Sequence, residues 1–463
     1  MNSKIMAITA VIVVVVVVAA GAIIVLNDDD SDSSDAAIAS QLQLYGNAND
    51  DSTIDSQDAE IIESIINQEE GYTLEKYPLA DANNDGTVDQ KDLDLVNKMI
   101  NRETGTAIKV ISLDTSGNTT VVPVTYPLRN IVTYATNVQM PVLYAGGAQY
   151  VAGFFSSTYD VAEKALIDNA KNFGASGRTI DDAAWNSFTS YASTLDGGVG
   201  ALIADYSGIK QITSARVSDL HAADIPLLIF SSADATDEIT TVLTLGYLFG
   251  TDCEQTAVKY AQTSWNVISQ VNDAIADISD DDRQTYIALT MFIYICQNDS
   301  TFNTTAATAG GIPYYKVNST FATAYEGTGS LKMGSTEALS NYSDVDILLN
   351  CRSMDWGLSD SSEVNALIID TWDHYSKSTS YLAYFAGFED KLVYINNLLP
   401  GAVKVAYMAH FMYGDKLSLD WADGVLQDFI DMGLDPLEGQ TTSSILSYVT
   451  QDTYNAAKAA TSS

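Results

Sequence analysis

Short apolar runs alternate with helical patterns along the chain after Ile108. Runs of this kind occupy residues 131–136, 200–206 and 225–232, with helical segments between them. A strand that is buried on both faces of a sheet gives a continuous apolar run, and such strands alternate with helices in parallel sheets. The pattern therefore predicts an α/β fold with mainly parallel, Rossmann-like sheets.

A long amphipathic helix follows this first set of strands. Apolar residues recur at steps of three or four from Val258 to Ile278, which predicts about 28 helical residues, or ~42 Å. Thr251 and Glu254 have the spacing of a capping box at its start. An ordinary crossover between strands does not need this length. We therefore expect residues 251–280 to bridge two lobes.

A second set of strand-like runs follows the helix. These runs occupy residues 285–295, 344–350 and 391–401, and the pattern after them predicts closing helices. The expected arrangement is a first lobe at 105–250 and a second lobe with closing helices at 281–463.

The amino-terminal segment from Ile5 to Leu26 contains no charged residue. It is long enough for a membrane-spanning helix, which needs ~20 apolar residues. One lysine precedes the segment and three consecutive aspartates follow it, so the positive-inside rule directs the rest of the chain outward. We expect residues 1–35 to be a single-pass cell-membrane anchor with an acidic tether, and the bulk of the chain to be extracytoplasmic. Cleavage after residues 19–22 would instead release the protein.

The charge balance narrows the classes of partner. The formal net charge is −38, although only 18% of residues are charged. Nucleic acid is excluded as a partner because phosphate binding needs clustered cations. The three cysteines show no zinc or redox spacing. The sequence leaves open whether Cys296 and Cys351 form a disulfide or remain free thiols.

Two segments repeat the oxygen-ligand spacing of a calcium loop. Loop one spans residues 47–58 and loop two spans residues 81–92, a spacing of 34 positions from 47 to 81. Calcium takes six to eight oxygen ligands, and positions 1, 3, 5, 7, 9 and 12 of such a loop supply them. The candidate metal ligands are Asn47, Asn49, Asp51, Thr53, Asp55, Asp58, Asp81, Asn83, Asp85, Thr87, Asp89 and Asp92.

The two loops depart from the pattern and from each other. Ser52 stands at position 6 of loop one, where a glycine is usual, and Asn47 stands at position 1 in place of aspartate. Loop two has four carboxylates at ligand positions and loop one has three, so we expect loop two to bind calcium more tightly. Ile54 and Val88 occupy position 8, where a short strand contact between paired loops would lie.

These tandem loops, each followed by an amphipathic helix, resemble the type I dockerin, a small duplicated calcium module. The resemblance implies an all-α domain at residues 36–104, two Ca²⁺ ions and a cohesin domain as a partner. It also implies that positions 10 and 11 of each loop face the cohesin. Those positions are Ser56 with Gln57, and Gln90 with Lys91.

The order lobe, long helix, lobe resembles the class III solute-binding proteins of ABC importers. Motifs at 141–154, 217–230, 239–250, 335–349 and 396–410 follow in the family's order. The resemblance implies capture of an iron chelate (such as a siderophore), haem or cobalamin, and an ABC importer permease as the partner. One acidic residue per lobe would dock on the permease. The candidates are Asp181 or Asp182 in the first lobe and Glu337 in the second.

The ligand of such a protein is expected between the lobes, near the carboxyl ends of the strands. The candidate substrate-binding residues are polar or aromatic: Tyr206, Ser231, Tyr315, Tyr325, Arg352 and Trp356. Arg352 directly follows a predicted strand, where its guanidinium could bind a carboxylate or phosphate through two hydrogen bonds. His374 and His410 are expected on helices, as packed or surface residues rather than axial ligands.

Two functions fit these features. The first is a membrane-anchored binding protein that delivers a metal chelate or tetrapyrrole to an importer. The alternative is a structural or adhesive cell-surface protein that acts through dockerin–cohesin pairing. We do not expect an enzyme, because the sequence has no nucleophile elbow, phosphate loop or zinc-protease motif.

Overall fold

The computed structural model describes residues 42–134, 136–155, 165–166, 170–174, 179–231, 234–290, 293–298, 300–327, 329–334, 339–373, 384–385 and 387–462. The membrane anchor and tether expected at residues 1–35 lie outside these ranges. Within them, no helix has both the length and the apolar character needed to cross a bilayer.

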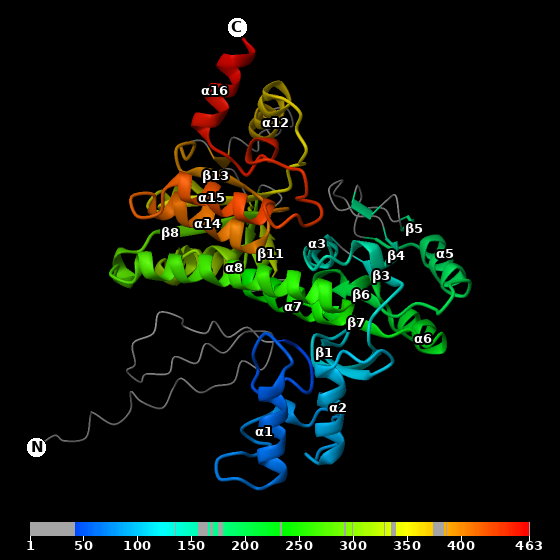
Figure 1. The fold of residues 1–463 in the computed structure, drawn as a ribbon. Coiled ribbons are helices and arrows are strands. Elements are labelled where there is room, and N and C mark those ends of the chain that lie inside the picture. The colour runs from blue at the N-terminus through cyan, green and yellow to red at the C-terminus, as the bar shows by residue number, and fades with distance from the viewer. Residues whose placement is uncertain are drawn as a thin grey trace, which may run out of the picture.

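Two short helices dominate the loop module, residues 42–104, which lies below the rest of the molecule in Figure 1. Helix α1 is Ser56–Ile66, helix α2 is Gln90–Ile100, and the 3-10 turn η1 is Pro78–Ala80. Each α-helix begins at a capping box formed by two aspartates, the N-cap residue and the residue three positions later. Such boxes satisfy backbone amides that have no partner inside the helix. The calcium-type spacing therefore also fixes where the helices start.

A hairpin joins the loop module to the body of the molecule, residues 107–462. Strands β1 (Ala107–Leu113) and β2 (Thr119–Thr125) pair antiparallel. Leu44 forms an antiparallel bridge with Val110 of β1. The Ser112 hydroxyl accepts a hydrogen bond from the Ile229 amide (2.8 Å) and donates to the Ile229 carbonyl (3.1 Å). The hairpin thus bonds the module on one side and the first lobe on the other.

The first lobe is built on a five-stranded parallel sheet in the order β5-β4-β3-β6-β7. Its strands are β3 (Ile131–Tyr134), β4 (Val151–Phe154), β5 (Lys171–Asn172), β6 (Leu202–Asp205) and β7 (Leu227–Phe230). Its helices are α3 (Thr136–Tyr144), η2 (Ala148–Tyr150), α5 (Asp182–Ala192), η3 (Tyr206–Gln211), α6 (Ser214–Ala222) and α7 (Ala235–Phe249). Strands β3 and β6 are buried along their whole length, as continuous apolar runs predict.

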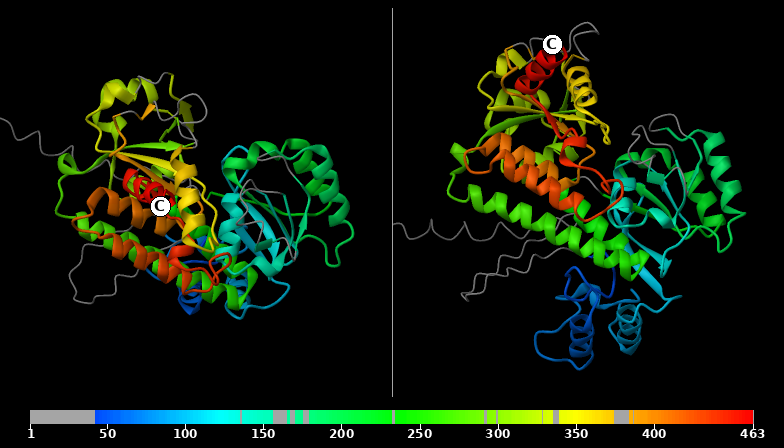
Figure 2. Two further views of the ribbon diagram at one scale, coloured as in Figure 1. Left: turned by 90° about the horizontal axis from the view of Figure 1, so that it is seen from above. Right: turned by 45° about the horizontal axis from the view of Figure 1, so that its top comes forward.

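Helix α8, Thr251–Ile275, follows α7 and runs beneath the second lobe (Figures 1 and 2). It ends five residues before the predicted limit of 280. The predicted capping box is wrong: Gly250 is the N-cap, and no side chain caps this helix. Glu254 instead forms an ion pair with Arg102 of the loop module.

The second lobe contains a seven-stranded mixed sheet. The main order is β11-β9-β8-β12-β13-β14, and β10 also pairs with β8. Strands β8, β10, β12 and β13 are parallel, whereas β9, β11 and β14 pair antiparallel. The strands are β8 (Thr285–Thr290), β9 (Tyr294–Cys296), β10 (Ile312–Pro313), β11 (Ser330–Lys332), β12 (Ile347–Arg352), β13 (Leu392–Asn396) and β14 (Tyr448–Val449).

Helices cover this sheet on both faces (Figure 2). They are η4 (Asp280–Asp282), α9 (Thr301–Thr308), α10 (Tyr314–Val317), α11 (Ser319–Tyr325), η5 (Leu339–Tyr342), α12 (Ser361–Asp373), α14 (Gly401–Tyr413), α15 (Leu419–Ile430), η6 (Thr442–Ser444) and α16 (Gln451–Thr461). Helix α14 packs against α8, α15 and α9. The closing helices therefore connect the second lobe to the long helix.

The cysteines are free thiols. Cys296 and Cys351 lie on β9 and β12, which are separated by β8. Strands two places apart are about 9–10 Å from each other, beyond the Cα separation of about 7 Å that a disulfide tolerates. Burial raises the pKa of the Cys296 thiol to about 12. The free-thiol alternative is therefore the one that the structure supports.

Candidate functional site

Loop one folds around its own carboxylates. One Asp58 oxygen accepts a hydrogen bond from the Asn49 amide (3.2 Å), and the other accepts from the Asp55 amide (2.8 Å). Asp51 accepts from both the amide (2.8 Å) and the hydroxyl (3.2 Å) of Thr53. These bonds hold the backbone in a tight turn. The oxygen atoms that could bind a metal are gathered along this one short segment.

The same bonds recur in loop two. Asp92 accepts from the amides of Asn83 (3.0 Å) and Asp89 (2.8 Å). Asp85 accepts from the amide (3.1 Å) and the hydroxyl (2.7 Å) of Thr87. The repeat seen in the sequence is thus also a repeat of hydrogen bonds.

Position 1 differs between the loops. Asp81 accepts from the amides of Asp85 and Gly86, at 3.0 and 2.7 Å. Asn47 instead donates its side-chain amide to the carbonyls of Leu42 (3.1 Å) and Asp51 (2.8 Å). The Asn47 side chain therefore stabilises the conformation of loop one through its own hydrogen bonds. Loop one in turn lacks the negative charge that an aspartate would carry at this position.

Position 6 also differs, and the structure shows how loop one turns without glycine. In loop two, Gly86 has a φ of 92° and Asn84 a φ of 57°. In loop one, Asp50 has a φ of 58°, but Ser52 is not among the described residues with positive φ. The left-handed residue at position 4 is thus common to both loops. Loop one has no second left-handed residue at position 6, because a serine would adopt that conformation only under strain.

The residues fit a calcium ion. The side-chain oxygens of Asn47 and Asn83 are buried and have no hydrogen-bond partner. Burial raises the pKa of Asp58 to about 7, with Asp51 and Asp55 adding to the effect, and burial also raises the pKa of Asp92. Crowded carboxylates and unpartnered amide oxygens are the hard donors that calcium prefers, and its charge would stabilise the ionised forms. Among the described residues, no three His, Cys, Asp or Glu side chains converge on a metal position by themselves, so amide and carbonyl oxygens would complete each shell.

The expected strand contact between Ile54 and Val88 is not among the bridges of the described chain. The Ile54 carbonyl instead accepts hydrogen bonds from Arg102. By contrast, the four residues at positions 10 and 11 are all exposed: Ser56, Gln57, Gln90 and Lys91. The surface that the dockerin resemblance assigns to a cohesin is therefore open in this fold.

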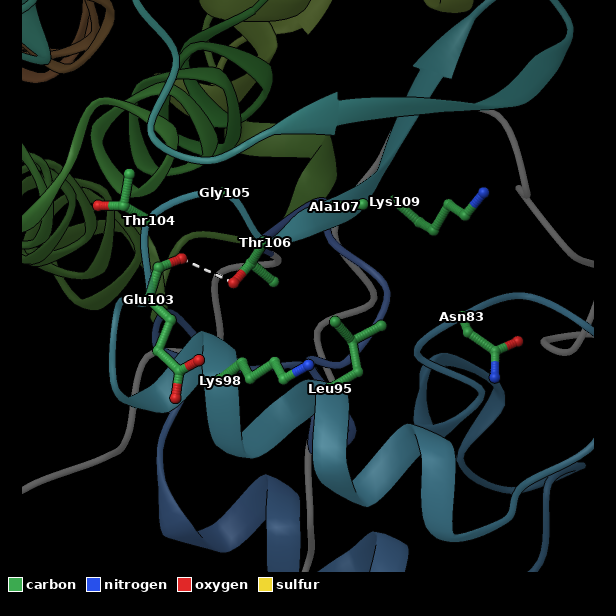
Figure 3. Close-up of a pocket in the computed structure, with 9 residues that line it drawn as sticks. All are labelled: Asn83, Leu95, Lys98, Glu103, Thr104, Gly105, Thr106, Ala107 and Lys109. Carbon is green, nitrogen blue, oxygen red and sulfur yellow. Dashed lines mark hydrogen bonds between the residues drawn. The ribbon is translucent and has the colours of Figure 1, made fainter.

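A pocket of about 430 Å³ opens beside loop two, at the joint between α2 and β1. It is lined by Asn83, Leu95, Lys98, Glu103, Thr104, Gly105, Thr106, Ala107 and Lys109. Figure 3 shows the Thr106 hydroxyl donating to the Glu103 carbonyl (2.6 Å), which closes the connecting turn. The loop-two side of the joint is thus hollow and accessible to solvent.

The carboxyl ends of three adjacent strands in the first lobe gather polar side chains. Asn137, in the first turn of α3 after β3, donates to Asp205 at the end of β6 (3.4 Å). Ser231, after β7, donates to Asp237 (2.6 Å). Because β3, β6 and β7 are neighbours and parallel, these groups lie along one edge of the sheet. Asp205 is only 3% exposed. The sequence does carry a signal for Asp205, because its carboxylate directly follows a buried apolar run. Asp205 is nevertheless not among the residues predicted from the sequence.

The predicted ligand residues divide into edge positions and packed positions. Tyr206 begins η3 beside this edge, is 40% exposed, and donates to the Ser116 carbonyl (3.5 Å). Arg352 ends β12 and is half-buried. Tyr325 and Trp356 are buried, and Tyr325 packs against aromatic rings of its own lobe. The Tyr315 hydroxyl accepts from Asn303 (3.2 Å). The structure thus brings Tyr206 and Ser231 to one edge, and it packs Tyr325 and Trp356 inside the second lobe.

The two permease-docking candidates of the first lobe lie side by side at the start of α5. Asp181 is the N-cap of α5 and accepts from the Ala184 amide. Asp182 has a fully exposed side chain, which Arg216 approaches to 3.4 Å. Glu337 and His374 lie outside the described residues. His410 contacts the Leu417 carbonyl through Nδ1 (2.9 Å), consistent with a packed histidine.

The sequence of the loop module matches a known domain. The match is to the dockerin type I domain, over residues 45–101. Residues 45–101 are a dockerin type I domain. No curated protein sequence matches the chain. The dockerin domain thus accounts for the calcium-type repeat, and it covers only the amino-terminal part of the chain.

The body of the molecule is similar to solved periplasmic binding proteins. The TroA-like periplasmic binding protein FepB from Veillonella parvula matches with a TM-score of 0.52 at 14% identity, over 73% of this chain and 99% of that chain. The molybdate periplasmic binding protein MolA from Haemophilus influenzae gives a TM-score of 0.48 at 10% identity, over 70% and 97%. A solute-binding protein of an ABC transporter from Sulfurospirillum deleyianum gives 0.46 at 13% identity, over 69% and 93%. The match to FepB shows that the body has the TroA-like binding-protein fold.

Proposed function

We propose that this chain is a membrane-anchored, extracytoplasmic solute-binding protein that captures a metal chelate or tetrapyrrole for an ABC importer. The observation that supports this most is the architecture: the long helix α8 leads from the sheet of the first lobe to the sheet of the second, and most of the paired strands are parallel. FepB shares this fold over 99% of its own length. Proteins of this fold bind and deliver a ligand rather than transform it, so we propose no catalytic residue.

The ligand would contact the polar edge of the first lobe and Arg352 of the second. Asn137, Asp205 and Ser231 offer both donors and acceptors on one lobe, and Arg352 offers a cationic fork on the other. A few convergent polar groups beside aromatic side chains are typical of small-molecule sites. We favour an iron chelate, haem or a cobalamin-like ligand. Asp181 or Asp182 and Glu337 would contact the permease.

A thermal-shift screen of the full chain tests this proposal. Ferric siderophores, haem and cobalamins would each be added in excess, and a true ligand at 100 times its Kd should add about 2.7 kcal/mol of stability. Arg352→Ala should reduce that gain, whereas the control Arg283→Ala should not, because Arg283 directly follows η4 and pairs with the exposed Asp280 of that turn. If none of these compounds raises the unfolding midpoint, the capture proposal fails.

We also propose that the dockerin domain binds two calcium ions, with loop two the tighter site. Support comes from the buried, unpartnered oxygens of Asn47 and Asn83 and from the fourth carboxylate that loop two has at a ligand position. Calcium titration calorimetry on the full chain checks the order. Asp85→Asn should weaken the tighter site, and Asp51→Asn, at the same position of loop one, should weaken the other. The reverse assignment would contradict this proposal.

A second function, adhesion or assembly through a cohesin, is favoured by one observation. Positions 10 and 11 of both loops are exposed. The pairs differ, because Lys91 forms ion pairs with Asp89 (3.1 Å) and Asp85 (3.7 Å) where loop one has Gln57. Calcium-dependent binding of the full chain to a panel of cohesins, lost in Lys91→Glu but not in Gln57→Glu, would support a one-sided partner surface. No binding to any cohesin would count against it.

A further inference from the structure

Arg102 connects the dockerin domain to helix α8. It follows α2 with a φ of 53°. Its guanidinium donates two hydrogen bonds to the Glu254 carboxylate of α8, one of them from Nε at 2.9 Å. The two side chains are only 20% and 11% exposed. An ion pair with two parallel bonds at this depth fixes geometry far better than a surface pair does.

The same guanidinium also holds loop one. Both terminal nitrogens donate to the Ile54 carbonyl at 3.3 Å, and Nη1 also donates to the carbonyls of Met99 (2.6 Å) and Ile100 (3.0 Å). The Tyr247 ring of α7 lies under the guanidinium at 4.7 Å, and its hydroxyl donates to the Met99 carbonyl (2.9 Å). Arg102 thus connects one peptide group of a calcium loop to both helices α7 and α8.

Ile54 lies between two candidate calcium ligands of loop one. It follows Thr53, whose carbonyl is the candidate ligand at position 7, and precedes Asp55 at position 9. Its side chain is 2% exposed, so its carbonyl cannot move without disturbing the module's core. Within the part of the chain that the structure describes, loop two has no matching attachment: Val88 is half-buried, and this side of the joint opens into the pocket of Figure 3.

We propose that Arg102 is a latch through which calcium in loop one, but not in loop two, fixes the dockerin domain on helix α8. The idea rests on the calcium part of the proposed function. With calcium, Thr53 and Asp55 are held and the Ile54 carbonyl stays within reach of Arg102. Without it, the crowded carboxylates of loop one repel, the carbonyl moves away, and the Arg102–Glu254 pair loses its support.

Hydrogen exchange of the full chain, with calcium and with a chelator, tests the latch. Chelation should speed exchange at residues 97–103 and at the start of α8, residues 251–258, by about tenfold, which corresponds to about 1.4 kcal/mol. In calcium, Asp51→Asn should reproduce this change at 251–258. Asp85→Asn, the matched change in loop two, should leave that segment protected. Glu254→Gln should make 251–258 exchange fast in both conditions while loop one still responds to calcium.

Two results would overturn the latch. Protection of 251–258 that does not depend on calcium, in a chain whose calorimetry shows calcium bound to both loops, would reject the latch and leave the calcium sites intact. An equal effect of Asp85→Asn and Asp51→Asn would reject the restriction to loop one. Absence of any calcium binding by calorimetry would reject both the latch and the sites on which it rests.

Discussion

At the scale of single residues, a buried carboxylate connects the two lobes. Glu238 of α7 accepts hydrogen bonds from the Tyr260 hydroxyl of α8 and from the Gly401 amide of α14 (2.6 Å). Helix α14 has no side-chain cap of its own, so Glu238 supplies the negative charge that a helix amino terminus favours. The Tyr144 hydroxyl adds a bond to the Leu398 carbonyl (3.1 Å). The long helix is therefore not the only connection between the lobes.

Removing the Tyr260 hydroxyl should be more costly than removing an ordinary buried one. Tyr260→Phe deletes a hydrogen bond to a charged group and should lower the free energy of unfolding by about 1.5–3 kcal/mol. Tyr413→Phe is the matched control, because its hydroxyl donates to a neutral carbonyl, that of Gly310 (2.8 Å), and should cost about 0.5–1.5 kcal/mol. Urea unfolding measures both. Equal losses in the two variants would show that the hydrogen bond to Glu238 stabilises the protein no more than a bond to a neutral carbonyl.

Residues with local partners could be predicted from the sequence, and residues with distant partners could not. The calcium-type ligands repeat within twelve positions, so their spacing was visible. Glu254 was assigned to a capping box because Thr251 lies nearby, but its partner Arg102 lies 152 positions away. Likewise, Glu238 and Gly401 are 163 positions apart. Only the fold brings such pairs together, so neither the latch nor the lobe contact has a sequence signal.

At the scale of elements, the close contact of α7 and α8 depends on one glycine. A Cβ added at Gly246 would lie 2.3 Å from the Ala257 Cβ and 2.9 Å from the Cys253 carbonyl oxygen. Gly246→Ala should therefore push the helices apart and cost about 1–3 kcal/mol. Gly424→Ala in the exposed face of α15 has nothing within 4 Å, so it should be neutral or stabilise by up to about 1 kcal/mol.

Thermal unfolding of the two variants separates packing from helix propensity. Both changes add the same methyl group inside a helix, so the propensity gain is common to them. A fall in the unfolding midpoint for Gly246→Ala alone would confirm the steric account. A rise for both would contradict it, because α7 and α8 would then have room for the extra methyl group.

Each apolar run that was predicted as a strand contains a strand of the structure, and the errors occurred where the pattern is ambiguous. The run at 285–295 was read as one strand, yet it forms β8 and the antiparallel β9. The motif at 141–154 contains strand β4, but its first residues, 141–144, complete helix α3. A short apolar run is compatible with a buried strand or a buried helix, and periodicity alone does not separate them. Which form is adopted depends on neighbours that the sequence pattern does not reveal.

At the scale of the whole molecule, the contacts between the lobes predict a body that changes shape little. Gly401 lies where a Cβ would come within 2.8 Å of the Ala235 Cα of α7 and 3.1 Å of a Glu238 oxygen. The first turn of α14 therefore packs directly on the first lobe, beside the hydrogen bonds of Glu238 and Tyr144. Interfaces packed this closely have discrete arrangements rather than a continuous range.

Spin-label distance measurements check this prediction. Labels would replace the exposed Asp182 on α5 and Asp452 on α16, with the half-buried Cys351 changed to serine and the other two thiols buried. The unmodified body should give one narrow distance distribution, because the α7–α14 contact fixes the lobes. Gly401→Ala should broaden it by separating that contact, whereas Gly424→Ala should leave it narrow. A broad distribution before any change at Gly401 would mean that α8 acts as a flexible connection and that the Glu238 contact does not hold the lobes together.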